Sequence, residues 1–210
     1  HTAAIYGFKL MLDHVLQNFK PDAALVAFDA GKVTFRTKMY DDYKGGRNKT
    51  PNELTEQIPY VRELIKDSGL HSYELANYEA DDIIGTLAKQ ADDAGYKTLI
   101  VTGDRDLTQL ASENTTVAVT HKGVTDTEHY TPAHVEEKLG ITPRQIIDMK
   151  ALMGDSSDNY PGVTKIGEKT AIKLVKQFGS VEELYDHIDD LKKSKMKEHL
   201  IEDEEVARQC

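Results

Sequence analysis

The sequence has few of the residues that mark disulfide-bonded, zinc-binding or membrane proteins. Its 210 residues include no tryptophan and a single cysteine, Cys210. One cysteine excludes an internal disulfide framework and is typical of a reducing cytoplasm, and the eight histidines lack zinc-type spacing. No apolar run is long enough to cross a membrane, and the chain opens at His1 with neither a secretion signal nor an initiating methionine. We therefore expect a globular cytoplasmic protein that is a fragment of a longer chain.

Basic residues are also scarce relative to acidic ones. The chain has 26 Lys and Arg against 36 Asp and Glu, which gives a net charge of −10. A negative charge on its own argues against nucleic acid as a partner. The basic residues are concentrated, however, in residues 32–50 and 165–176. The length, with 39% hydrophobic and 30% charged residues, predicts one domain or one domain with a small appendage.

The most distinctive stretch is YEADDIIGTL, residues 78–87. Glu79, Asp81 and Asp82 stand just before apolar residues at helical spacing. Acidic residues are common in the first turn of a helix, where the unpaired amides favour negative charge, and this would explain one or two of them. Asp81, three residues before Ile84, should lie on the inward edge of the helix. Buried carboxylates repel one another unless a cation lies among them, so the stretch predicts half of a metal site.

Further acids follow two expected strands. The apolar run 23–28 ends at Asp29, and the strand 98–102 is followed by Asp104 and Asp106. A strand, a helix and a strand with short links predict a right-handed parallel unit. Because the carboxyl ends of parallel strands share one edge of a sheet, we expect these acids and the acidic helix start to meet there.

Periodicity and turn residues predict most of the remaining elements. A strand is expected at 115–120, turning at Lys122 and Gly123, and the basic and acidic residues of 192–205 predict a solvated end. Helices are expected at 3–18, 50–69, 79–94, 107–111, 131–140, 143–154, 168–178 and from Ser180 onward.

Residues 32–50 combine basic and aromatic side chains. Basic groups contact phosphates and aromatic rings stack on bases, so this segment could form a nucleic-acid arch. A solvated mobile loop explains the same composition equally well. The residues concerned are Phe35, Arg36, Lys38, Tyr40, Tyr43, Lys44, Arg47 and Lys49.

A second nucleic-acid element is expected at PGVTKIG, residues 161–167. Gly162 and Gly167 bracket a tight turn between two helices, the pattern of a helix-hairpin-helix. Glycines there let backbone amides approach a phosphate, and the start of the next helix strengthens the attraction. Lys165 and Lys169 add positive charge. A plain helical turn is the alternative, but it explains neither the paired glycines nor the lysines.

Eight acids stand out as candidate metal ligands, more than structural pairing requires. Oxygen ligands select hard cations, so Mg²⁺ or Mn²⁺ is favoured over zinc. Two such ions ~4 Å apart catalyse in-line phosphoryl displacement, and the basic segments indicate a nucleic-acid phosphodiester as substrate. The eight are Asp29, Glu79, Asp81, Asp82, Asp104, Asp106, Asp155 and Asp158.

These motifs, in this order, resemble the 5′ nuclease domains of bacterial DNA polymerase I, within the flap endonuclease family. The segments that carry the resemblance are AFDAGKVTFR, YKGGR, YEADDIIGTL, TGDRDLTQL and MGDSSDNYPGVTKIGEKTAIKLVKQFGSVEEL. The resemblance implies an α/β fold: a PIN-like parallel-sheet core at 1–142 with a basic arch at about 32–50, and a helix-three-turn-helix subdomain at 143–210. It also implies two Mg²⁺ ions, often a K⁺ ion at the hairpin, and removal of 5′ nucleotides or flaps from DNA in primer removal and repair.

The resemblance further assigns roles to residues. Asp155 and Asp158 would hold the second metal ion, and the other six acids would hold metals directly or through water. Lys44 and Arg47 would steer the scissile phosphate and stabilise its charge. The expected DNA-binding residues are Arg36, Lys38, Gly162, Lys165, Gly167 and Lys169.

The sequence departs from the family at its start. Members begin with a strand that ends in another metal-ligating Asp, and this chain begins after it. We therefore expect a sheet without a central strand, in part of a longer polymerase that acts on nucleoid DNA in the cytoplasm. Three interpretations stay open: a metal-dependent 5′ nuclease, a non-catalytic module that binds structured DNA, and a PIN-type ribonuclease. The hairpin favours DNA over RNA.

Overall fold

The computed structural model describes residues 2–121, 123 and 125–209. Lys122, at the expected turn, and Cys210 lie outside these ranges. The first half of the chain contains α1 (Ala3–Phe19), β1 (Leu25–Ala27), α2 (Phe35–Met39), α3 (Asn52–Thr55), α4 (Ile58–Asp67), β2 (His71–Tyr73), α5 (Ala80–Asp93) and β3 (Thr98–Thr102).

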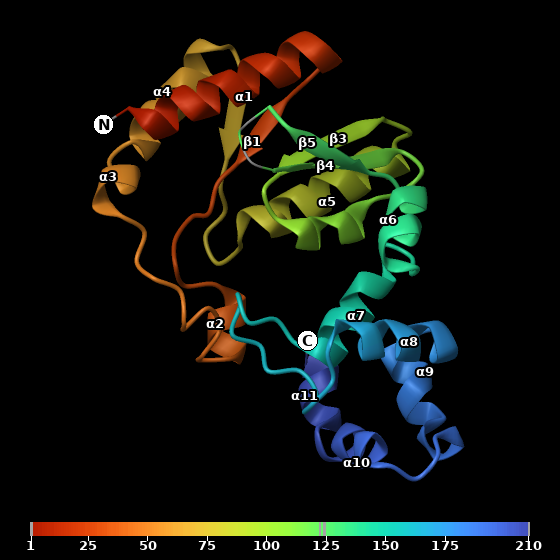
Figure 1. Cartoon of the computed structure of the whole chain (residues 1–210). Coiled ribbons are helices and arrows are strands. Elements are labelled where there is room, and N and C mark those ends of the chain that lie inside the picture. Colours follow the sequence, from red (N-terminus) through yellow and green to blue (C-terminus); the bar gives the residue numbers. More distant parts are fainter. Residues whose placement is uncertain (1, 122, 124, 210) are drawn as a thin grey trace.

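The second half begins with a 3₁₀ helix and ends in a group of helices (Figure 1). Its elements are η1 (Arg105–Leu110), β4 (Thr115–Thr120), β5 (Thr127–Tyr130), α6 (Pro132–Leu139), α7 (Gln145–Met153), α8 (Glu168–Phe178), α9 (Val181–Asp186), η2 (Ile188–Asp190), α10 (Lys195–Glu202) and α11 (Glu204–Gln209). The expected helices are present, and the basic segment contains the short helix α2.

The strands of the described residues form two sheets. In one, β1 and β2 run parallel, with Leu25 opposite His71. In the other, of order β3-β4-β5, β4 is parallel to β3 and antiparallel to β5. The predicted unit of residues 23–28, the acidic helix and residues 98–102 does not form among the described residues, because β1 and β3 lie in different sheets; β3 pairs in parallel with β4 instead. The short strands β2 and β5 were not predicted, because their three and four residues carry polar side chains rather than an apolar run.

No pairing joins β1 to β3 among the described residues, so the acids after these strands do not share one sheet edge as predicted. Instead, α5 brings the two edges together, because it packs against both β1 and β3.

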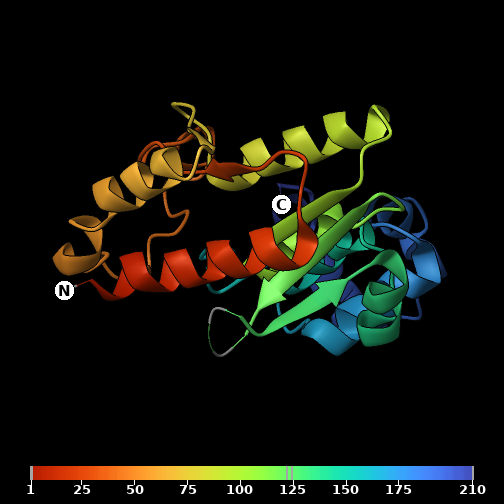
Figure 2. The ribbon, with the colours of Figure 1, turned by 90° about the horizontal axis from the view of Figure 1, so that it is seen from above.

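The buried apolar residues form two groups. A small one joins α1 to α4 through Leu12, Val61 and Ile65 beside the β1–β2 sheet (Figure 2). The main core starts at Ile100 and Val117 of β3 and β4 and continues through α7 into the helices α8–α11. The three-stranded sheet and the C-terminal helices therefore share one core.

The C-terminal segment is folded, and most charged residues of 192–197 and 202–205 are exposed, as expected for a solvated surface. The buried residues between and after them were not predicted. Leu200 is 0% exposed and Ala207 is 1% exposed. The hydroxyl of Tyr185 donates to the carbonyl of Leu200 at 2.8 Å. The charged residues of this segment lie on the outer faces of α10 and α11. Because they outnumber the few buried apolar residues, the buried side of these helices is not evident from the sequence. In the part of the chain that the structure describes, no helix combines the length and apolar character needed to cross a membrane.

Leu200 tests whether the last helices contribute to stability. We expect Leu200→Ala to lower the free energy of unfolding by about 2–5 kcal/mol, because it leaves a cavity in the main core. The neighbouring Ile201, which is 51% exposed, provides the control, and Ile201→Ala should change stability by less than about 0.5 kcal/mol. Urea unfolding followed by circular dichroism measures both, and equal effects would contradict the assignment of α10 to the core.

Candidate metal and nucleic-acid site

The start of α5 is fixed by its own acids. Glu79 caps the helix in a box with Asp82, whose Oδ2 accepts from the Glu79 amide at 2.9 Å. Arg36 of α2 donates to both oxygens of Asp82 at 2.8 Å. Burial alone would raise the pKa of Asp82, but the hydrogen bonds from Arg36 and from the Glu79 amide hold it below its usual value. Asp82 therefore connects the basic segment to the acidic helix.

Glu79 is only 8% exposed, and two side chains of the basic segment cover it. Lys44 Nζ lies 2.9 Å from Glu79 Oε1, and the Tyr43 hydroxyl donates to Glu79 Oε2 at 3.3 Å. A buried carboxylate requires such partners. The arch is thus held over the acids by specific contacts and does not extend freely into solvent.

Asp29, Asp81 and Asp104 come together at the start of α5. Asp29 Oδ1 accepts from the amide of Ala80 at 2.7 Å. Burial, and to a lesser extent the negative charges of Asp104, Glu79 and Asp29, together raise the pKa of the half-buried Asp81 to about 6. Acids from separate segments thus interact electrostatically at the start of α5, although they do not share one sheet edge as predicted.

A second group of acids lies beside the first. One oxygen each from Asp106, Asp155 and Asp158 lie within 4.8 Å of one another. Asp155 and Asp158 stand on a loop that is closed by two backbone hydrogen bonds between Asp155 and Tyr160. The amide of Asp106 donates to Asp104 Oδ1 at 2.8 Å, so Asp104 and Asp106 connect the two groups.

Lys150 of α7 lies inside the second group, and the sequence analysis did not identify it. Its Nζ is 2.9 Å from Asp106 Oδ1 and 2.7 Å from Asp155 Oδ2. Burial alone would lower the pKa of Lys150, but hydrogen bonds to Asp155 and Asp106 raise it. The sequence signal that could have identified Lys150 was its position in the helix between Met149 and Ala151, which are both buried.

The two acids that contact Lys150 respond differently. Burial would raise the pKa of Asp155, but the bonds from Lys150 and Ser157 lower it strongly. The pKa of Asp106 is raised, mainly by burial, although Lys150 acts in the opposite direction. Asp155 is therefore the main ionic partner of Lys150, and Asp106 is the less compensated acid.

Asp158 has its own basic partner. Arg47 Nη2 lies 2.6 Å from Asp158 Oδ1, and Arg47 Nε donates to the Ser157 carbonyl at 3.1 Å. Both predicted phosphate-steering residues, Lys44 and Arg47, thus contact acids of the site. Together with Arg36 and Lys150 they place four cations against the carboxylates. The carboxylate oxygens of Asp106, Asp155 and Asp158 fit a hard divalent cation, because such cations prefer oxygen ligands.

The hairpin brings two backbone segments into close contact. A Cβ on Gly162 would lie 2.2 Å from the Gly154 amide nitrogen, and both glycines have positive φ, so no other residue fits. Gly167 caps α8 without a side-chain hydrogen bond, which leaves first-turn amides open to an anion. Lys165 and Lys169 are exposed beside them. The predicted helix–hairpin–helix geometry is present.

The other two predicted DNA contacts are engaged within the protein. The guanidinium of Arg36 binds Asp82 and also lies 4.5 Å from the ring centroid of Phe35. Lys38 Nζ donates to Asn77 Oδ1 at 2.9 Å. Lys38 is exposed and can reach an external phosphate, whereas Arg36 supports the acidic helix.

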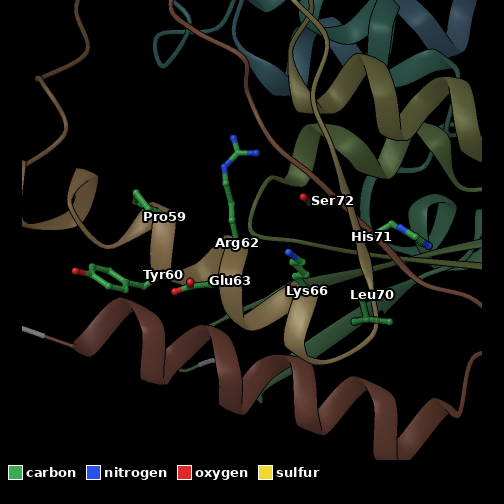
Figure 3. Close-up of a pocket in the computed structure, with 8 residues that line it drawn as sticks. All are labelled: Pro59, Tyr60, Arg62, Glu63, Lys66, Leu70, His71 and Ser72. Carbon is green, nitrogen blue, oxygen red and sulfur yellow. The ribbon is translucent and has the colours of Figure 1, made fainter.

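A surface pocket lies away from these residues. Its volume is ≈ 660 Å³, and it is lined by α4 and the start of β2, including Arg62, Lys66 and His71 (Figure 3). None of the predicted site residues lines it.

An α/β core with carboxylates at strand ends and at a helix start, followed by a helical hairpin subdomain, defines the class of PIN-like nucleases with an acidic metal centre. Within that class, the chain belongs to the 5′-3′ exonuclease family. The family model described as "5′-3′ exonuclease, N-terminal resolvase-like domain" matches residues 1–140, and "5′-3′ exonuclease, C-terminal SAM fold" matches residues 141–210. The family and fold expected from the motifs are thereby confirmed.

Curated relatives support the same assignment. DNA polymerase I of Streptococcus pneumoniae strain R6 is 59% identical over 207 residues, which cover 99% of this chain and 24% of that protein. DNA polymerase I of Bacillus subtilis strain 168 is also 59% identical over 207 residues, with the same coverage. The chain thus spans about a quarter of the length of these relatives, 24%.

Solved structures show the same fold at lower identity. The T5 5′-exonuclease with bound divalent zinc ions has a TM-score of 0.81 at 24% identity, covering 95% of this chain and 76% of its own. The catalytic core of Rad2 in complex with a DNA substrate has a TM-score of 0.61 at 19% identity, covering 95% of this chain and 63% of its own.

The raised pKa of Asp81 predicts a pH-dependent effect on stability. In the absence of metal, Asp81 destabilises the folded state when it is charged. This loss of stability develops as the pH rises from the unfolded pKa of about 3.9 to the folded pKa of about 6, and it is complete above that pH. Asp81→Asn should therefore stabilise the metal-free protein by about 1–2 kcal/mol at pH 8, after allowance for solvent screening, and by nothing at pH 3.5.

Urea unfolding in EDTA at the two pH values measures this difference. Asp93, an exposed acid at the end of α5 that pairs with Lys89, gives the control variant Asp93→Asn, which should change little at either pH. Destabilisation by Asp81→Asn at pH 8 would show that the acids at the start of α5 are already compensated.

Proposed function

We propose that this chain is a Mg²⁺-dependent 5′-3′ exonuclease and 5′-flap endonuclease that hydrolyses DNA phosphodiesters in primer removal and repair. The observation that carries the proposal is the pair of adjoining acid groups, one around Asp81 and one of Asp106, Asp155 and Asp158, with the basic arch held against both. Carboxylates from four separate segments lie at one place. A metal site explains this arrangement more simply than a purely structural role does.

We infer that the two groups hold two Mg²⁺ or Mn²⁺ ions. Asp29, Asp81 and Asp104 would hold one ion with Glu79 and Asp82 behind them, and Asp106, Asp155 and Asp158 would hold the other. The metals, when bound, polarise the phosphate and lower the pKa of a coordinated water. Their divalent character is supported by the metal-bound T5 5′-exonuclease, which shares this fold. We further propose a K⁺ ion at the hairpin turn beside Gly162.

Within the chain, Lys44 and Arg47 would act on the substrate. Both extend from the arch toward the acids, so a phosphate that enters between arch and acids meets these two cations. Their positive charge would orient the scissile phosphate and stabilise the charge that develops on it. Tyr43 keeps Lys44 in place, because both side chains contact Glu79.

Duplex DNA would be held by the second half of the chain. Gly162 and Gly167 expose backbone amides, and Lys165 and Lys169 supply charge at the same place. Lys38, and Arg36 if released from Asp82, would contact the strand near the arch. A flap endonuclease of bacteriophage T5 that shares this fold was solved with DNA and metal ions.

The wider setting is also a proposal. The relatives support a nuclease unit within a longer DNA polymerase I that acts on nicked or flapped DNA of the nucleoid in the cytoplasm. We assign residues 1–142 to the nuclease core and residues 143–210 to the DNA-binding subdomain.

A non-catalytic DNA-binding role is the second candidate. It is favoured by the four basic side chains that already neutralise the acids, because a site compensated in this way is stable without metal. Cleavage assays separate the two candidates.

Asp104→Asn tests the nuclease directly. With a 5′-flap duplex, the unchanged chain should cut in Mg²⁺ and not in EDTA. The substitution removes the charge that connects the two acid groups, and we expect cleavage to fall by at least ~10²-fold, as for loss of support at a metal site. Asp13→Asn, an exposed acid on α1, should cut normally. If neither the unchanged chain nor the variant cuts while both bind the flap, the non-catalytic role holds.

Lys169→Ala tests the grip on duplex DNA. Removal of one phosphate contact should weaken binding of every duplex sequence alike and reduce the slope of log K against log salt by ~0.9. Lys89→Ala, an exposed lysine of α5, is the matched control. Fluorescence anisotropy over a salt series measures both, and an unchanged slope for Lys169→Ala would remove this residue from the interface.

A further inference from the structure

The arch and the loop of Asp155–Tyr160 are joined by a set of contacts that we call the arch clasp, between residues 40–47 and 157–160. Backbone and amide groups form part of it. The amide of Lys44 donates to the Asp158 carbonyl at 2.9 Å, and Asn159 Nδ2 donates to the Asp42 carbonyl at 2.9 Å. The Tyr40 hydroxyl donates to the Asn159 carbonyl at 3.3 Å.

Arg47 supplies the ionic part of the clasp. It binds the Asp158 carboxylate at 2.6 Å and the Ser157 carbonyl at 3.1 Å. The same carboxylate belongs to the group with Asp106 and Asp155 that fits a divalent cation. One side chain, Asp158, therefore takes part in both the clasp and the candidate metal site.

The charges in this group decide which contact can persist. Three carboxylates face two cations, Lys150 and Arg47, so the group is nearly neutral without metal. A divalent cation added beside both of them would make the group positive, and the like charges would repel at short range. Departure of one of the two basic side chains when the metal is bound would remove this repulsion.

Arg47 is the side chain that can leave. Its side chain is 51% exposed, and it stands in the irregular segment between α2 and α3. Lys150 is 25% exposed and belongs to α7, which is part of the main core. Lys44, whose amide belongs to the clasp, has a φ of 57°, a conformation that lysine rarely adopts and that the intact clasp helps to maintain.

We propose that a divalent cation at Asp106, Asp155 and Asp158 displaces Arg47 from Asp158 and thereby opens the arch clasp. In the absence of metal, Arg47 closes the arch onto the acids; with metal, Arg47 and residues 40–47 are free to receive a nucleic-acid strand. This inference rests on the proposed metal site and adds a coupling between metal binding and the position of the arch.

Hydrogen–deuterium exchange of the whole chain without DNA tests the coupling. The amides of residues 40–47, including that of Lys44, should exchange about three- to tenfold faster in Mg²⁺ than in EDTA with NaCl at equal ionic strength, the factor expected for losing one net hydrogen bond. Unchanged or slower exchange in Mg²⁺ would overturn the proposal.

Two variants sharpen the test. Arg47→Gln should show the faster exchange already in EDTA, with little further change in Mg²⁺. Arg62→Gln removes an ion pair of similar length with Glu74, at 2.8 Å, outside the arch, and should respond to Mg²⁺ like the unchanged chain. If Arg47→Gln exchanges like the unchanged chain in EDTA, Arg47 does not close the clasp and the proposal fails.

Direct metal binding separates this proposal from the proposed function. Mn²⁺ binding to the same samples is measured by electron paramagnetic resonance, without any cleavage step. Mn²⁺ binding with unchanged exchange overturns the coupling alone. No Mn²⁺ binding at all overturns both the metal site and the coupling.

Discussion

Repulsion among crowded carboxylates governs the arrangement of this molecule. Acids from β1, α5, η1 and the 155–160 loop meet at one place, and the protein neutralises them with basic groups from two other segments. Hydrogen bonds from Lys150 and Ser157 lower the pKa of Asp155, whereas burial and neighbouring acids raise the pKa of Asp81. The contacts of the arch and of Lys150 with the acids provide this compensation.

Much of the fold and of the acidic site could be predicted from the sequence, because the strongest signals are local. The apolar run of β3, the helical period of α5 and the glycines of the hairpin each determine structure within a few residues. The strands β2 and β5 escaped prediction because they are short and polar, and their pairing depends on neighbours distant in sequence. The helices α10 and α11 were not predicted because each has only one buried residue among many charged ones.

Basic residues were harder to assign than acidic ones. A lysine or arginine in a sequence can bind an external phosphate or an internal carboxylate, and only the tertiary structure shows which. Arg36 was expected on DNA, but it forms a two-bond pair with Asp82. Lys150 was not predicted as a site residue, but it lies between two acids that were predicted as metal ligands. The fold of the backbone determines where acids at strand ends lie. A long basic side chain can instead reach several different partners, and the sequence does not show which one it contacts.

The end of helix α7 connects the acids to the hairpin. Lys150 of this helix contacts the acids, and four residues later Gly154 lies against the hairpin at Gly162. Four residues of helix correspond to about 6 Å, and Asp155 follows Gly154 directly. The proposed metal site and the proposed duplex site are thus adjacent on one short, folded stretch of chain, so that a change at the hairpin glycines would also displace Asp155.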